Sequence, residues 1–323
     1  IKDHASREVV DMGVEALKVL YHRGAIDADG KTGDGAGIQT NIPKKFFIEQ
    51  IERTGNTPNN FPFAVGMVFL PRTDFNAQER SRTIVESEII ESGFKIYGWR
   101  YVPVNIKYIG DKAKTTRPEI EQILIGNDVY KDETEFDKAL YVVRKRIEKR
   151  IRQENINEFY ICSLSSQMII YKGMFLAEQL SNFYPDILDQ RFISKFAVYH
   201  QRYSTNTFPT WSLAQPFRVI AHNGEINTLK GNKNWMTAHE PRLKHKNFEN
   251  IDDLKPIIDP NASDSAALDA AIELLVCSNR SLPMAKILTI PEAWAHRRDF
   301  PKKLNRKPIE EMCWEEDFGK KIF

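Results

Sequence analysis

The stretch HQRYSTNTFPTW, residues 200–211, decides how this chain is interpreted. It follows a segment, 192–199, in which apolar and polar residues alternate, a pattern that indicates a half-buried strand. The stretch then enters a polar loop, which places Arg202 close to the end of the predicted strand. A guanidinium at a strand end can bind a carboxylate through two parallel hydrogen bonds. From composition alone, a carboxylate clamp and a surface salt bridge are equally good interpretations of Arg202.

A second motif, HNGEINTLKGNKNW at 222–235, follows another predicted strand, FRVIAH at 217–222. Asn-Gly is the strongest short signal for a hairpin turn, and a turn is the better interpretation of Asn223 and Gly224 taken alone. The alternative is catalytic, because an asparagine amide and a glycine N–H aimed at one point can stabilise an oxyanion.

A third motif, SDSAALD at 263–269, opens a helix predicted over 263–278. Simple capping of that helix by Ser263 or Asp264 is the better interpretation of the motif alone. The functional alternative is that Asp264 pairs with the ammonium group of a substrate.

The glycine-dense loop DGKTGDGAG, residues 29–37, follows an amphipathic helix predicted over 6–22, which Gly24 is placed to end. A phosphate-binding loop would need a glycine where Ala25 stands, and the dinucleotide fingerprint fails at Ile38. We therefore predict a tight turn that uses positive φ angles.

The remaining elements are predicted from apolar periodicity. The segment 111–134 is polar and gives no clear prediction. Because strands and helices mix without a regular βαβ rhythm, we expect an α+β layered fold. The predicted strands are 63–70, 99–104 and a pair at 159–164 and 168–172. The predicted helices are 75–92 and 136–151. The second helix carries a basic face, made of Arg144, Lys145, Lys149 and Arg150, which we interpret as solvated.

Composition excludes several classes of protein. The 323 residues carry a formal charge of +2, whereas nucleic-acid platforms usually show a marked basic excess. Three cysteines, Cys162, Cys277 and Cys313, give neither a disulfide framework nor a zinc pattern, and the first two are interpreted as core residues. No apolar run is long enough for a transmembrane helix, and the start has no signal-peptide architecture.

Together and in this order, the motifs resemble the class II glutamine amidotransferase domain of glutamate synthases. The resemblance covers residues 1–294 and includes HRGA at 22–25 and RSLPMA…PEAW at 280–294. The long match over 200–235 separates glutamate synthases from the wider family. The resemblance implies a four-layer αββα sandwich of the N-terminal-nucleophile type, here incomplete at both ends, followed by a divergent charged tail at 295–323.

The resemblance also implies hydrolysis of L-glutamine to glutamate and ammonia. In the family, an N-terminal cysteine attacks the side-chain amide and its own α-amino group serves as base. Arg202 would hold the α-carboxylate of glutamine and Asp264 its α-ammonium. Asn223 and Gly224 would form the oxyanion hole, and Arg23 would help to order the rim of the site.

In glutamate synthases the ammonia passes to a synthase domain of the same polypeptide, which makes glutamate from 2-oxoglutarate with FMN and an iron–sulfur cluster. The expected partners are therefore L-glutamine, that domain, and a small NADPH-oxidising subunit or ferredoxin. No cofactor, metal, nucleic acid or membrane is expected for this domain. The resemblance implies a cytoplasmic or plastid location.

Two features depart from the family. The family domain begins with Cys-Gly, whereas residue 1 here is Ile1, so we expect this chain alone to be inactive. The tail after Trp294 is unlike the strands expected there, and an open sheet edge would lower solubility. One alternative is a non-catalytic glutamine-binding or regulatory module. Another is a sugar-phosphate or phosphoribosylamine amidotransferase, although these are more compact between 22–25 and 200–211.

Overall fold

The computed structural model describes residues 4–204, 207–222, 224 and 226–290. The predicted tail at 295–323 lies outside the described residues. The chain divides into two compact units, Ile1–Gly224 and Glu225–Phe323, and each is described by itself. Within the described ranges, no helix combines the length and apolar character needed to cross a membrane.

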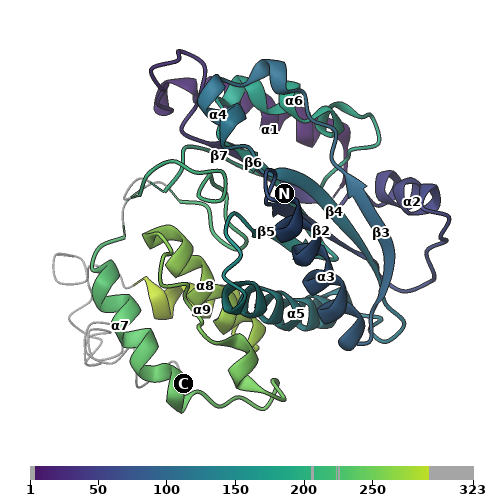
Figure 1. The fold of residues 1–323 in the computed structure, drawn as a ribbon, viewed down its shortest axis with the longest axis vertical. Coiled ribbons are helices and arrows are strands. Elements are labelled where there is room, and N and C mark those ends of the chain that lie inside the picture. The colour runs from purple at the N-terminus through teal and green to yellow at the C-terminus, as the bar shows by residue number, and fades with distance from the viewer. Residues whose placement is uncertain (1–3, 205–206, 223, 225, 291–323) are drawn as a thin grey trace, which may run out of the picture. The chain divides into compact units, whose positions relative to one another are not determined.

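The first unit contains a four-stranded antiparallel sheet in the order β3-β4-β2-β5 (Figure 1). Both faces of its central strand β2 are buried, because Val65 and Met67 belong to one hydrophobic core while Ala64 and Val68 belong to another. This burial explains the continuous apolar run in the sequence. The strands are β2 (Ala64–Leu70), β3 (Lys95–Tyr101), β4 (Glu119–Gly126) and β5 (Tyr160–Ser165).

Two long helices, α3 (Phe75–Glu91) and α5 (Glu133–Gln153), cover one face of this sheet (Figure 1). Each begins at an aspartate whose carboxylate accepts hydrogen bonds from N–H groups of the first turn, Asp74 for α3 and Asp132 for α5. Their apolar stripes, which include Ile84 on α3, pack on the same core as Val68. The periodicity that predicted both helices is thereby confirmed.

The second sheet has three antiparallel strands in the order β6-β1-β7. Helix α1 (Arg7–Val19) packs on β7 closely enough that a Cβ added at Gly13 would lie 2.5 Å from Cβ of Ala197. The helix contributes Val10, Val14 and Leu17 to a core that also contains side chains from both sheets. The strands are β1 (Ala36–Asn41), β6 (Met168–Gly173) and β7 (Ala197–Gln201). The expected α+β class is confirmed, because the first unit combines helices with two antiparallel sheets.

A buried ion pair lies among side chains of both sheets. The Nη1 and Nη2 atoms of Arg100 on β3 each donate to Asp186 over 2.7 Å. Tyr171 on β6 donates to the same carboxylate over 2.9 Å, and Gln122 on β4 donates to the tyrosine oxygen. Burial alone would lower the pKa of Arg100, but the ion pair with Asp186 gives a net rise. A fixed charge pair therefore connects the two sheets.

The second unit is helical in its described part. Ser263 caps α8 by accepting a hydrogen bond from the Ala266 N–H. Helices α7 and α9 pack beside α8. The helices of the second unit are α7 (Leu229–His239), α8 (Asp264–Cys277) and α9 (Leu282–Thr289).

The first unit also has three shorter α-helices: α2 (Lys44–Arg53), α4 (Asp111–Thr115) and α6 (Leu180–Phe183).

Several sequence predictions are corrected. The segment 217–222 is not a strand. The segments 159–164 and 168–172 are strands, but they do not pair with each other, because β5 pairs with β2 and β6 pairs with β1. The alternation at 192–199 gives a strand only from Ala197 onward.

Strand positions around the polar segment are corrected too. The strand predicted at 99–104 begins earlier and ends at Tyr101. The polar segment 111–134 contains the unpredicted strand β4, which lies inside the four-stranded sheet. Its polar residues disguised it: Glu121 is buried in an ion pair with Arg82, and Gln122 is buried against Tyr171.

The basic face of α5 is also not simply solvated. Arg144 and Lys145 are buried, and both form ion pairs with Glu148. Burial raises the pKa of Glu148, but the cations Arg144, Lys145 and Arg218 outweigh burial and bring the pKa to about 2. This half of the basic face is therefore an internal charge cluster.

Replacing Arg100 with methionine should lower the free energy of unfolding by about 3–5 kcal/mol, because the Asp186 carboxylate stays buried without its partner. Urea unfolding followed by circular dichroism measures the change. The control is Arg53→Met, which removes an exposed pair with Glu49 and should cost less than about 1 kcal/mol. Equal losses in both variants would contradict a structural role for the buried pair.

Glu148 should stabilise the fold in a pH-dependent manner. Its folded pKa of about 2 lies below the ordinary value of 4.5, so the stabilisation is complete above pH 4.5 and is lost as the pH falls toward 2. Glu148→Gln should therefore cost on the order of 3 kcal/mol at pH 7 and progressively less below pH 4.5. Unfolding curves of both proteins between pH 7 and 3 measure the difference, and a difference that grows on acidification would refute the assignment.

Candidate functional site

Arg202 follows the last residue of β7 and is held in an unusual backbone conformation. Its φ angle is +138°, a region that residues with side chains rarely adopt. Its carbonyl oxygen accepts a hydrogen bond from the Gln215 N–H, and its Nε donates to Asp34 Oδ2 over 3.0 Å. The Arg202 side chain is 39% exposed, whereas that of Asp34 is only 6% exposed. The guanidinium is therefore fixed from the protein side and open to solvent on the other.

The glycine-dense loop supplies Asp34. Asp29 organises the loop: its carboxylate accepts hydrogen bonds from the Thr32 hydroxyl and from the N–H groups of Lys31 and Thr32, and these bonds lower its pKa. Gly30 and Gly35 have φ angles of +68° and +147°. The predicted tight turn with positive φ angles is confirmed, and nothing in the loop suggests phosphate binding.

The end of β7 carries further polar side chains. His200 Nε2 lies 2.7 Å from the His222 carbonyl oxygen, and burial lowers the pKa of His200. The charge of Arg23 acts on His200 in the same direction, which places Arg23 in this region. The Gln201 side chain packs against Gly24, and neither atom of its amide has a partner within the described part of the chain.

Of the two oxyanion candidates, Asn223 and Gly224, the structure describes only Gly224. Asn223 lies outside the described residues. Gly224 is exposed, and a Cβ added there would meet no atom within 4 Å. Its backbone therefore borders open space at the end of the first unit.

Asp264 is the first residue of α8 in the second unit. The capping role belongs to Ser263, so Asp264 is not the cap. Its carboxylate accepts from the Ile226 N–H over 3.0 Å and from the N–H and hydroxyl of Ser265. The side chain is buried, and its negative charge at a helix N-terminus is electrostatically favourable. Asp264 is thus a rigidly held carboxylate.

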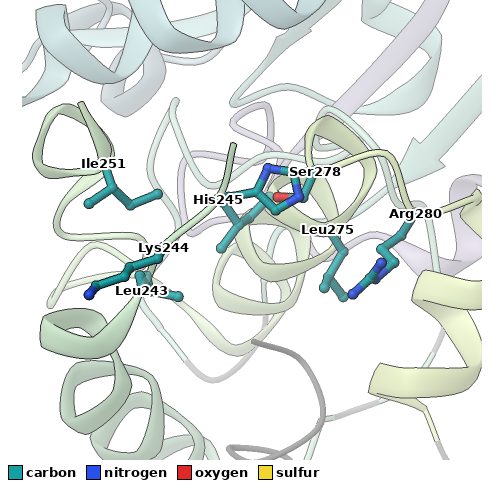
Figure 2. Close-up of a pocket in the computed structure, with 8 residues that line it drawn as sticks. Leu243, Lys244, His245, Ile251, Leu275, Ser278 and Arg280 are labelled. Carbon is teal, nitrogen blue, oxygen red and sulfur yellow. The ribbon is translucent and has the colours of Figure 1, made fainter. Parts of the chain in front are cut away.

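A small cavity in the second unit is lined by none of these residues. Figure 2 shows that it lies between the segment carrying Leu243 and His245 and the end of α8, near Ser278. Since α8 has 14 residues, its two ends are about 20 Å apart, and Asp264 lies at the opposite end. Burial, followed by the charges of Arg280 and Lys246, lowers the pKa of His245. The cavity contains no predicted site residue.

The described cysteines have no catalytic character. Cys162 is buried in β5, and burial raises its pKa to about 12, as predicted for a core residue. Cys277, at the end of α8, is only partly buried. Among the described residues, no cluster of three or more histidine, cysteine or acidic side chains could hold a metal ion.

Sequence reasoning missed Asp34. The available signal was an acidic residue between two glycines in the loop 29–37, which we interpreted only as turn chemistry. Its role depends on its neighbour Arg202, which the pairing of β1 with β7 brings to the same end of the sheet.

Comparison with known proteins gives a consistent result. Residues 1–307 match the family described as "Glutamine amidotransferases class-II". The chain is 56% identical over 308 residues to the glutamate synthase [NADPH] large chain of Azospirillum brasilense, covering 95% of this chain and 20% of that protein. It is 42% identical over 306 residues to the ferredoxin-dependent glutamate synthase of Pyropia yezoensis, covering 93% and 20%. It is 40% identical over 309 residues to the glutamate synthase [NADPH] large chain of Bacillus subtilis, covering 94% and 20%. The chain thus spans a fifth of the length of these relatives.

Gly35→Ala should destabilise the protein more than Gly30→Ala. Both glycines have positive φ angles, but a Cβ at Gly35 would also lie 3.1 Å from Ala214 Cβ, while the space at Gly30 is open. We expect a loss of about 1 kcal/mol for Gly30→Ala and roughly 2–3 kcal/mol for Gly35→Ala. Urea unfolding of the two variants tests the ranking, and the reverse order would contradict the described loop.

Proposed function

The chain belongs to the class-II glutamine amidotransferase family, and from that premise we propose that it is the glutamine-hydrolysing domain of a glutamate synthase. The reaction would convert L-glutamine to glutamate and ammonia for transfer to 2-oxoglutarate. The observation that carries the proposal is Arg202, an open guanidinium held at a strand end by a buried carboxylate. The similarity to glutamate synthases along more than nine-tenths of this chain supports the specific enzyme.

Glutamine recognition needs groups of opposite charge, because free glutamine carries an α-carboxylate and an α-ammonium. We assign the carboxylate to Arg202, whose guanidinium matches a carboxylate in bidentate geometry. We assign the ammonium to Asp264, a buried and rigidly held carboxylate of opposite charge. Arg23 would order the rim of the site, as its electrostatic effect on His200 supports.

The amide carbonyl of glutamine becomes an oxyanion when it is attacked. We propose that Asn223 and Gly224 donate the hydrogen bonds that stabilise this charge. The open space around Gly224 supports access by a ligand. Removal of one such donor typically raises the barrier by about 2.7–4 kcal/mol.

The nucleophile would be the N-terminal cysteine that the family uses. The three cysteines within residues 1–323 are internal, so none has the free α-amine that would serve as base. The high pKa of Cys162 also leaves very little thiolate at neutral pH. The residues of this chain would therefore bind, orient and stabilise charge around the N-terminal cysteine of the family's mechanism.

The iron–sulfur cluster of glutamate synthases does not fit the residues described here. Cluster binding requires several cysteine thiolates, and the described residues include only Cys162, buried in a strand, and Cys277. We place the cluster and the flavin, and the NADPH-oxidising subunit or ferredoxin, with the rest of the enzyme. We propose a cytoplasmic or plastid location.

The fold expected for such a domain is the four-layer αββα sandwich. Two features of the first unit support it: α3 and α5 share a core with one face of the four-stranded sheet, and α1 contributes to a second core that also contains side chains from both sheets. We infer that these are the four layers.

A non-catalytic glutamine-binding or regulatory module is the alternative. Both functions predict glutamine binding, and only the enzyme predicts turnover. Ammonia release from L-glutamine by the protein that carries this chain, together with covalent capture of an electrophilic glutamine analogue, distinguishes them. Tight binding without either reaction would favour the module.

Arg202→Ala should weaken L-glutamine binding by about 100-fold, because two charge-assisted hydrogen bonds to the α-carboxylate are lost. Isothermal titration calorimetry measures the dissociation constant. Arg53→Ala, which removes an exposed arginine from α2, is the control and should bind as the unmodified protein does. Unchanged binding in Arg202→Ala would refute the assigned carboxylate clamp.

A further inference from the structure

We propose that Asp34 is a positioning residue: it binds the Nε–H of Arg202, so that Nη1 and Nη2 form the pair that holds the substrate carboxylate. The inference rests on the proposed function, because it concerns how the same guanidinium selects its ligand. Asp34 belongs to the glycine-dense loop, and the proposed function gives it no contact with the substrate.

The geometry restricts how Arg202 can bind a carboxylate. A guanidinium offers two edges for bidentate binding, one formed by Nε with one Nη and one formed by both Nη groups. Asp34 Oδ2 accepts from Nε over 3.0 Å, which occupies the first edge. Within the described ranges neither Nη group has a hydrogen-bond partner, and the side chain is 39% exposed. The edge formed by Nη1 and Nη2 is therefore the one left for a ligand.

The surrounding backbone makes this orientation rigid. The φ angle of +138° at Arg202 is maintained by the Gln215 N–H bond to its carbonyl and by the bridge between Tyr203 and Ala214. On the other side, the Asp34 N–H donates to the Ala25 carbonyl over 3.1 Å. Both partners of the ion pair are thus attached to fixed main chain, so that little side-chain entropy remains to be lost when a ligand binds.

The arrangement is costly for stability alone. Asp34 is 6% exposed, and its Oδ1 atom is buried without a hydrogen-bond partner among the described residues. A buried carboxylate with one unsatisfied oxygen is unfavourable, and such groups call for an explanation outside folding. Orientation of Arg202 for a ligand is that explanation.

The charge balance of the pair affects specificity. Asp34 neutralises Arg202, so a ligand gains less from long-range attraction and more from two directed hydrogen bonds. The site should therefore favour a planar carboxylate over small monoatomic anions. It should also discriminate L-glutamine from its α-amide, in which the α-carboxylate is replaced by a neutral carboxamide.

The test compares two substitutions and two ligands in the protein that carries residues 1–323. Asp34→Ala removes the acceptor of the Nε–H bond, and Asp34→Asn keeps an oxygen acceptor without the charge. We expect the affinity for L-glutamine to fall about tenfold in Asp34→Ala and to stay within about threefold in Asp34→Asn. Affinity for L-glutamine α-amide should not change in either variant. Calorimetry supplies all the dissociation constants.

Other outcomes would overturn the inference. Equal losses for L-glutamine and its α-amide would indicate a merely structural role, and tighter L-glutamine binding in both variants would indicate that Asp34 acts only through its charge. If the unmodified protein binds L-glutamine and Arg202→Ala does not, yet Asp34→Ala binds normally, this inference fails alone. If the unmodified protein does not bind L-glutamine, the proposed function and the inference fail together.

A second measurement does not depend on the folding of the variants. The guanidinium nitrogens of Arg202 can be followed by nitrogen-15 NMR in the unmodified protein. Addition of L-glutamine should shift the Nη resonances and leave the Nε–H resonance unchanged. A shift confined to Nε would contradict the proposed division of the guanidinium.

Discussion

The ion pair between Arg100 and Asp186 is the constraint on which the arrangement of the first unit depends. Two opposite charges buried together are stable only if their hydrogen bonds are well aligned, and here Tyr171 and Gln122 complete the network. Arg100 and Gln122 belong to the four-stranded sheet and Tyr171 to the three-stranded sheet. A shift of one sheet against the other would separate these partners and leave buried charges unpaired, so the network opposes such a shift.

The register of β1 and β7 within the three-stranded sheet determines where the candidate site forms. In the antiparallel register of β1 and β7, Ala36 lies opposite Gln201. The residues just before β1 and just after β7 therefore lie at the same end of the sheet, and this end contains Asp34 and Arg202. The glycine-dense loop allows the chain to turn tightly there, since Gly35 has a φ angle that other residues rarely adopt. The ion pair of the site is a consequence of strand register, although its residues are 168 positions apart.

The sequence identified elements whose burial pattern is simple. Helices α1, α3 and α5 have one apolar stripe each, and β2 is apolar throughout because both its faces are buried. It did not identify β4, because Glu121 and Gln122 are buried polar residues whose partners lie far away in the chain. It wrongly predicted a strand at 217–222, an irregular segment in which Phe217 is buried and Arg218 is partly buried. Arg202 and Asp264 came from motif resemblance, while Asp34 required the pairing of two distant strands.

Three features that depart from local rules lie at one end of β7. Arg202 has a strained φ angle, Asp34 has an unsatisfied buried oxygen, and the Gln201 amide has no partner among the described residues. Each is unfavourable for folding, and each persists because the surrounding sheet and loop fix the backbone. The buried polar groups around Asp186, by contrast, are hydrogen-bonded to one another. Departures from local rules are expected at functional sites, and in this chain a strained backbone angle and an unsatisfied carboxylate oxygen meet in the ion pair of Arg202 with Asp34.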